Sequence, residues 1–223
     1  MAKLTESIDA LPEVTKCYKF KGIKRSQYQK RHYGHWCPYM PTPQLTAEHR
    51  RDGTIADNFV NQAQPLFYEM SAVLGGLLPR LFKDMQLFPV PGTVGRMCGA
   101  WASCVINDGG DNPKHTNLHR DVKESPYGYS CVIACGDYIE GDLILYDLGC
   151  KIQLNPGDIL IFPDSLIHHM NEEAEGKRKS VVAFTQQNMF DYWNRRHGRK
   201  QRTRKKQERR QNKERSRIKK LIS

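Results

Sequence analysis

The most regular hydrophobic pattern in the chain lies between residues 46 and 85, where apolar side chains recur at spacings of three and four. This spacing places them on one face of a helix. The residues expected on that face are Phe59, Val60, Ala63, Phe67, Met70, Val73, Leu74 and Leu77. Pro65 and Pro79 are expected to kink or divide the segment, because proline cannot donate a backbone hydrogen bond. A helix with one apolar face requires a surface to cover, so we expect it to pack against a sheet.

From about residue 99 the pattern changes to short apolar segments separated by turn residues. Gly, Asp, Asn and Pro mark the turns, as in Asn155-Pro156-Gly157-Asp158. The expected strands are residues 100–106, 129–134, 143–146, 151–154, 159–162 and 180–185. Many short strands at this spacing indicate a β-sandwich or barrel. The fold class is therefore expected to be mainly β with N-terminal helices.

These patterns divide the 223 residues into four regions. Residues 1–45 are an N-terminal extension rich in basic and aromatic side chains, and residues 46–94 are the helical support. Residues 95–194 are the β core, and residues 195–223 are a basic tail that is either disordered or a solvated helix. The length suits one domain with a tail better than two domains.

The positive charge of the chain is concentrated in the tail. Residues 195–220 contain 15 Lys and Arg and two acids, a local charge of +13, whereas the whole chain carries +11. The remainder is therefore close to neutral, at −2. Such a block favours polyanions, so a nucleic-acid partner contacted through its phosphates is one interpretation. A nuclear targeting signal and a merely solvated charged segment are the others.

The location expected from the sequence is intracellular, and nuclear if the tail is a targeting signal. No apolar run is long enough to span a bilayer, and the first residues lack the apolar core of a secretory signal.

The seven cysteines form no C-x-x-C pair and are expected to be reduced and buried. A structural zinc on Cys17, His32, His35 and Cys37 is a minor alternative, because these residues lack the paired spacing of zinc fingers.

The candidate chemistry begins with the His119-Arg120-Asp121 sequence. On a strand, His119 and Asp121 would project from the same face, although such a pair alone is more often a surface turn. A further histidine, His169, follows 48 residues after Asp121, and it is expected at the end of the strand that runs through residues 159–162. Two imidazoles and one carboxylate on one side of iron(II) leave its other side open for oxygen chemistry.

A candidate co-substrate site follows at Arg178 and Ser180, which would share one face of the next strand. The planar guanidinium can bind a carboxylate through two parallel hydrogen bonds, although an isolated arginine is more often a surface charge. A co-substrate that binds iron through a keto acid and arginine through a distant carboxylate is 2-oxoglutarate. Asn107, at the end of an expected strand, is interpreted as a turn cap, with a contact to co-substrate or substrate as the alternative.

The segment from His119 to Trp193 resembles the double-stranded β-helix (jelly-roll) core of the iron(II)/2-oxoglutarate dioxygenases. It is most similar to the fungal branch related to the TET/JBP nucleic-acid base oxygenases. The matching segments are residues 119–129, 136–145, 156–171, 178–180 and 184–193. The resemblance implies iron(II) bound by His119, Asp121 and His169, and 2-oxoglutarate held by Arg178 and Ser180. It does not cover residues 1–95 or the tail.

The resemblance also bears on the choice between His168 and His169, which point to opposite faces if they lie on a strand. The sequence motif L-I-x-H-x-N of the fungal branch favours His169 as the ligand, two residues before Asn171. Met170 stands where this branch often has a small residue, and it is expected to narrow the pocket.

The implied activity is hydroxylation of a C–H bond with dioxygen and 2-oxoglutarate. A methylated nucleic-acid base is the first expected substrate, because of the tail and the similarity to the TET/JBP branch. A protein side chain such as proline, as in prolyl hydroxylases, is the alternative. A nucleic-acid-binding protein without catalytic activity is the third possibility, against which the complete ligand set argues.

Overall fold

The computed structural model describes residues 1–12, 28–37, 42–86, 97–110, 114–126 and 128–196. The helices of these segments are α1 (Ala2–Asp9), α2 (Ala47–Asp52), α3 (Thr54–Leu77), α4 (Pro79–Gln86) and α5 (Gln187–Arg196), with a short 3-10 helix at Tyr146–Leu148. The strands are β1 (Gln29–Trp36), β2 (Gln44–Leu45), β3 (Ser103–Asp108), β4 (Thr116–His119), β5 (Ser130–Glu140), β6 (Leu143–Leu145), β7 (Cys150–Ile152), β8 (Ile159–Phe162), β9 (His169–Asn171) and β10 (Ala174–Phe184). Nearly all of the expected basic tail lies outside the described residues.

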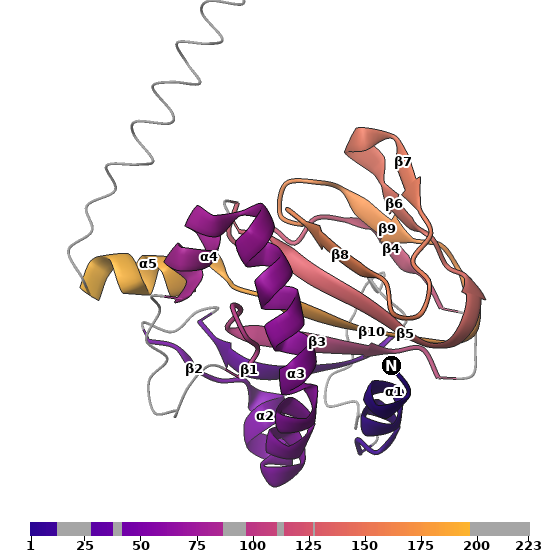
Figure 1. Ribbon diagram of the computed structural model, residues 1–223, viewed down its shortest axis with the longest axis horizontal. Helices are drawn as coiled ribbons and strands as arrows, with labels where there is room; N and C mark the ends of the chain where they lie inside the picture. The colour runs from indigo at the N-terminus through magenta and orange to yellow at the C-terminus, as the bar shows by residue number, and fades with distance from the viewer. Residues whose placement is uncertain (13–27, 38–41, 87–96, 111–113, 127, 197–223) are drawn as a thin grey trace, which may run out of the picture.

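The strands form two antiparallel sheets that pack against each other (Figure 1). The six-stranded major sheet has the order β2-β1-β3-β10-β5-β8, and the four-stranded minor sheet has the order β4-β9-β6-β7. One hydrophobic cluster joins them, in which Leu143 and Leu145 of β6 meet Tyr138 of β5 and Phe162 of β8. A core therefore lies between the two inner faces, as in a β-sandwich.

The outer face of the major sheet is covered by helices (Figure 1). Alternate residues of β3 and β10, including Ile106 and Val181, share one buried cluster with Phe59 and Phe67 of α3 and with Ile8 of α1. The intervening residues of the same strands face the minor sheet, because successive side chains point to opposite faces of a strand. The prediction that an amphipathic helix covers a sheet is confirmed.

The expected apolar face of α3 is buried at Phe59, Val60, Ala63, Phe67, Met70 and Leu74. Val73 and Leu77 are exposed instead, because Val73 lies at the margin of the apolar arc and Leu77 is the last residue of the helix. Pro79 divides the segment as predicted and begins α4, where its missing N–H costs nothing. Pro65 does not divide it, since α3 continues through this residue.

Six expected strands correspond to β3, β5, β6, β7, β8 and β10, and the mainly β fold class with N-terminal helices is confirmed. β1 was not expected, because it comes from the segment interpreted as an N-terminal extension. It pairs with β3 from Gln29 opposite Asp108 to Gly34 opposite Ser103, and so widens the major sheet. The division into four regions stays a prediction. No helix of the described segments has the length and apolar character needed to cross a membrane.

Candidate metal centre

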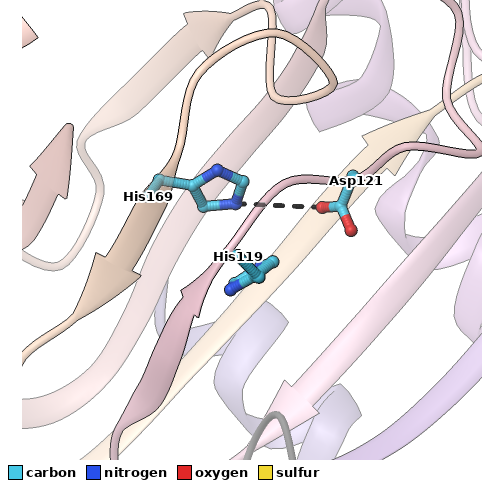
Figure 2. Close-up of side chains that lie close together, drawn as sticks. All are labelled: His119, Asp121 and His169. Carbon is cyan, nitrogen blue, oxygen red and sulfur yellow. Dashed lines mark ion pairs between the residues drawn. The ribbon is translucent and has the colours of Figure 1, made fainter. Parts of the chain in front are cut away.

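Two histidines from neighbouring strands of the minor sheet face each other. His119 ends β4, His169 begins β9, and the antiparallel register places them directly opposite. Their ring centroids are 4.3 Å apart. Figure 2 shows the His169 ring directed at the Asp121 carboxylate, with the His119 ring close by. The pairing was not expected, because His169 was predicted to extend the strand at 159–162. That strand is β8 of the major sheet, and the chain crosses to the minor sheet before His169.

Asp121 lies beyond the end of β4, in the turn that follows. Its backbone N–H donates to the carbonyl oxygen of Asp164 over 3.1 Å, which fixes the turn against the chain after β8. Its Oδ2 atom lies 3.8 Å from Nε2 of His169. The expectation that His119 and Asp121 share a strand was therefore wrong, although the turn still brings both side chains to one point.

Backbone carbonyls orient both imidazole rings. Nδ1 of His119 lies 2.5 Å from the carbonyl oxygen of Asn117, and Nδ1 of His169 lies 2.9 Å from that of Ile167. A carbonyl oxygen only accepts, so each ring carries its proton on Nδ1 and presents the lone pair of Nε2. Such a bond to the second ring nitrogen is the usual support of a metal-binding histidine.

The donor set fits a divalent transition metal. One donor atom from each of His119, Asp121 and His169 can be chosen so that all lie within 4.8 Å of one another. All three residues line one cavity of about 90 Å³, called here the metal cavity. Two imidazoles and one carboxylate on one side of an ion leave the opposite side open, which is the arrangement typical of non-haem iron(II) oxygenases.

His168 lies outside this group. Its backbone N–H donates to Oδ2 of Asp147 over 2.7 Å, and its Nδ1 lies 2.9 Å from the same oxygen. These hydrogen bonds lower the pKa of the Asp147 carboxyl. The side chain of His168 is 41% exposed, whereas His169 is buried.

Arg178 enters the metal cavity from β10. It is 3% exposed, its Cζ atom lies 5.5 Å from the centroid of the Tyr138 ring, and its Nη1 donates to Oη of Tyr28 over 3.4 Å. Nε of Arg178 has no hydrogen-bond partner, and no ion pair joins the guanidinium to a carboxylate among the described residues. A buried cation without a counter-charge is costly. The carboxylate of a bound acid would supply the missing partner.

Ser180 is the next residue of β10 that faces the metal cavity, and it is buried. Nδ2 of Asn107 donates to its Oγ atom over 3.1 Å, which leaves the hydroxyl hydrogen of Ser180 available to an acceptor. Asn107 lines the same cavity, so the co-substrate alternative fits this residue better than a turn cap.

Gly141 leaves the space that Arg178 occupies. A Cβ atom at this position would lie 3.0 Å from Cδ of Arg178 and 2.6 Å from Cβ of Ala174. The backbone φ angle of 74° also favours glycine. A residue with a side chain would therefore push the guanidinium out of place.

Solved structures share this architecture. NgTET1 in complex with 5mC DNA superposes with a TM-score of 0.58 and 19% identity, covering 72% of this chain and 61% of that one. The chain thus spans less than two thirds of the NgTET1 chain. The chain has the fold of the iron(II)/2-oxoglutarate oxygenases.

Two further solved structures match less closely. A 2OG-Fe(II) oxygenase family oxidoreductase from Burkholderia pseudomallei has a TM-score of 0.48 and 16% identity, covering 82% of this chain and 76% of its own. The viral collagen prolyl hydroxylase vCPH from Paramecium Bursaria Chlorella virus-1 has a TM-score of 0.38 and 8% identity. The match covers 70% of this chain and 78% of the viral chain. No family model matches the sequence, and no curated protein matches it.

Several residues in or beside the metal cavity were not found from the sequence. Lys30 and Asp164 line the cavity, and Tyr28 and Tyr138 contact Arg178. Tyr28 and Lys30 come from the segment to which no role was assigned, and Tyr138 and Asp164 carried no motif. Alternation along β5 could have indicated Tyr138, since it lies on the same face as Ala134. Met170 does not narrow the pocket: it neighbours Ile144 of β6, and neither of the two cavities around the candidate centre has it in the lining.

The zinc alternative finds no support in the described part of the chain. His32 faces the inside of the major sheet, whereas His35 lies on the opposite face of β1 and is buried. The two rings therefore point apart. Cys17 lies outside the described residues.

Proposed function

We propose that the chain is an iron(II)- and 2-oxoglutarate-dependent dioxygenase that hydroxylates a C–H bond. One observation carries the proposal: the group of His119, Asp121 and His169 lines the same cavity as Arg178, a buried residue with no carboxylate partner among the described residues. A metal-binding group alone would suit many metalloproteins. A metal-binding group beside a cation that lacks a carboxylate suits a metal with an acidic co-substrate.

In this proposal His119, Asp121 and His169 hold the iron through two Nε2 atoms and a carboxylate oxygen. When bound, iron(II) with 2-oxoglutarate and dioxygen supplies the oxidation of a C–H bond, with succinate and carbon dioxide as co-products. Arg178 binds the distant carboxylate of 2-oxoglutarate, and Ser180 donates its hydroxyl hydrogen to the same group. Asn107 and Tyr28 position these two residues.

The substrate that we propose is a methylated base in nucleic acid. NgTET1, which shares the fold, was solved in complex with 5mC DNA. The local charge of +13 in the tail suits phosphate contacts. Both observations also favour a nuclear location, which we propose together with the substrate.

The decisive experiment is anaerobic reconstitution with iron(II) and 2-oxoglutarate, followed by dioxygen and measurement of succinate. We expect succinate to form only when all three components are present, and His119→Ala or Asp121→Ala to abolish it. Mass spectrometry of methylated DNA, methylated RNA and proline-containing peptides then identifies the substrate. A +16 Da product in peptides alone would favour the prolyl-type hydroxylase, and no succinate under any condition would favour a binding protein without activity.

A further inference from the structure

A second cavity adjoins the metal cavity and is larger, with a volume of about 280 Å³. We call it the outer pocket. The two cavities share the lining residues Lys30, Val105, Asp121, Asp164 and Val182. Because Asp121 lines both, a group held in the outer pocket lies next to the proposed iron.

We propose that the outer pocket binds one unstacked nucleobase of the substrate, and that Trp36 of β1 is the residue on which this base stacks. The inference rests on the proposed function and adds to it the part of the chain that selects the substrate. The N-terminal strand lies outside the segment whose sequence resembles known oxygenases, and it would then decide which group reaches the iron.

The strand register shows how β1 reaches the proposed iron. His32 lies opposite Val105 of β3, which lies opposite Val182 of β10. These three side chains form one row on the inner face of the major sheet, and all of them line the outer pocket. β1 therefore extends the floor of the metal cavity outward.

Aromatic rings form the wall above this row. The ring centroids of His32 and Trp36 are 5.6 Å apart with an interplanar angle of 30°, and Phe184 lines the same pocket. Nδ1 of His32 lies 3.6 Å from Oε1 of Glu48 on α2, so a carboxylate lies beside the imidazole without a direct hydrogen bond to it. Stacking on aromatic side chains is the usual way in which proteins hold an unpaired base.

Charge around the pocket suits the phosphates that flank a base. Arg120 and Lys123 lie on the exposed turn that carries Asp121, and Lys30 lies on the floor. Lys and Arg side chains are the common partners of phosphate oxygens. The lining also contains three acids: Asp121 faces the proposed iron, Asp164 is buried, and Glu124 is half-buried. The exposed charges of the lining are therefore the basic side chains of Arg120 and Lys123. The volume is close to the lower end of small-molecule pockets, which suits one ring rather than a folded segment.

Binding of short single strands tests the inference without requiring turnover. Two trinucleotides are compared on the full-length protein, one with 5-methylcytosine at the centre and one with an abasic site there. The phosphates are the same, so the basic tail contributes equally to both affinities. We expect the wild-type protein to prefer the base-containing strand by about 5- to 140-fold, the range that one stacked base contributes.

Trp36→Ala should remove most of this preference, and Trp36→Phe should keep much of it. The matched control is Tyr68→Ala, which removes an exposed ring of α3 and should leave the preference intact. Lys123→Gln, on the exposed turn, should weaken the binding of both trinucleotides to the same extent. It is the second variant to be measured if Trp36→Ala does not fold. Thermal melting verifies the fold of each variant.

The outcomes separate this inference from the proposed function. An equal preference in the wild type and in a folded Trp36→Ala variant overturns it, and so does a wild type that binds neither strand. If Trp36→Ala instead weakens the binding of a proline-containing peptide, the pocket binds a protein substrate, and the proposal that it binds a nucleobase is wrong. Absence of succinate, by contrast, refutes the dioxygenase and leaves the binding result to be judged by itself.

Discussion

His168 is bound to Asp147 through both its backbone N–H and its ring, at 2.7 Å and 2.9 Å. This pair holds the His168 side chain on the outside of the minor sheet, while the adjacent His169 turns toward Asp121. Two neighbouring histidines thus have different partners, and a single substitution at each can separate their roles.

His169→Ala should lose iron, because it removes one of three ligands. His168→Ala should keep it, because its ring contacts Asp147 and not the candidate metal centre. The metal content of the two purified variants after reconstitution gives the answer. If His168→Ala lost the iron and His169→Ala kept it, the ligand assignment would be reversed.

Arg178→Ala should weaken binding of 2-oxoglutarate while iron stays bound, since the guanidinium lies outside the group of metal ligands. Loss of a buried charged partner costs about 2–5 kcal/mol. Calorimetric titration with 2-oxoglutarate measures the change, and Lys177→Ala, an exposed neighbour on β10, is the control. An unchanged affinity in folded Arg178→Ala protein would refute the proposed clamp.

Gly141→Ala should also weaken 2-oxoglutarate binding, because the new Cβ would lie 3.0 Å from Cδ of Arg178. Gly149→Ala is a matched control, since Gly149 also has a positive φ angle but no atom within 4 Å of an added Cβ. Both variants carry backbone strain, so the difference between their affinities reports on the crowding of Ala174 and Arg178 by the new Cβ. Equal affinities would show that the guanidinium tolerates the displacement.

His35 should make the protein less stable in acid. Burial, with a contribution from the nearby His49, lowers the pKa of His35 from 6.5 to about 4. Between these values the unfolded chain binds a proton that the folded chain does not. The free energy of unfolding is therefore highest, as far as His35 is concerned, above pH 6.5. It falls by about 1.4 kcal/mol per pH unit as the pH decreases from 6.5 toward 4.

The test is urea unfolding of wild-type protein and His35→Gln between pH 4 and pH 7. Glutamine does not titrate, so the variant should show a shallower dependence on pH even if its absolute stability differs. Parallel curves for the two proteins would contradict the assignment.

Truncation after Arg196 should reduce nucleic-acid affinity and leave 2-oxoglutarate turnover without substrate intact, because all proposed ligands precede the tail. If the tail contacts phosphates of duplex DNA, log affinity should fall with log salt by about 0.9 for each phosphate neutralised. The truncated protein should show a much smaller slope. Titrations at several salt concentrations measure both, and equal slopes would exclude the tail as the contact.

The fold was predictable where the hydrophobic period was clear. The buried face of α3 and the strands from β5 to β8 follow directly from the spacing of apolar residues. β1 was not predictable by this means, because its buried positions include Arg31 and His35 and its inner face carries Lys30, His32 and Trp36. A strand with polar residues on both faces has no alternation of apolar and polar side chains to detect.

The residues of the candidate centre could be predicted from the sequence, but the turns and strands that carry them could not. The residue types and order of His119, Asp121, His169 and Arg178 indicated an iron site with an acidic co-substrate. The sequence did not show that Asp121 lies in a turn fixed by Asp164, or that His169 starts a new strand. These contacts join residues more than 40 positions apart, so local patterns do not encode them.

The position of β10 has a consequence for biosynthesis. This strand lies between β3 and β5 in the major sheet, although it is the last of the described strands along the sequence. The nascent chain therefore cannot join the two halves of that sheet until residues 174–184 have left the exit tunnel. Arg178 arrives with the same strand, so a chain that stalls before it would expose unpaired strand edges, which are prone to aggregate.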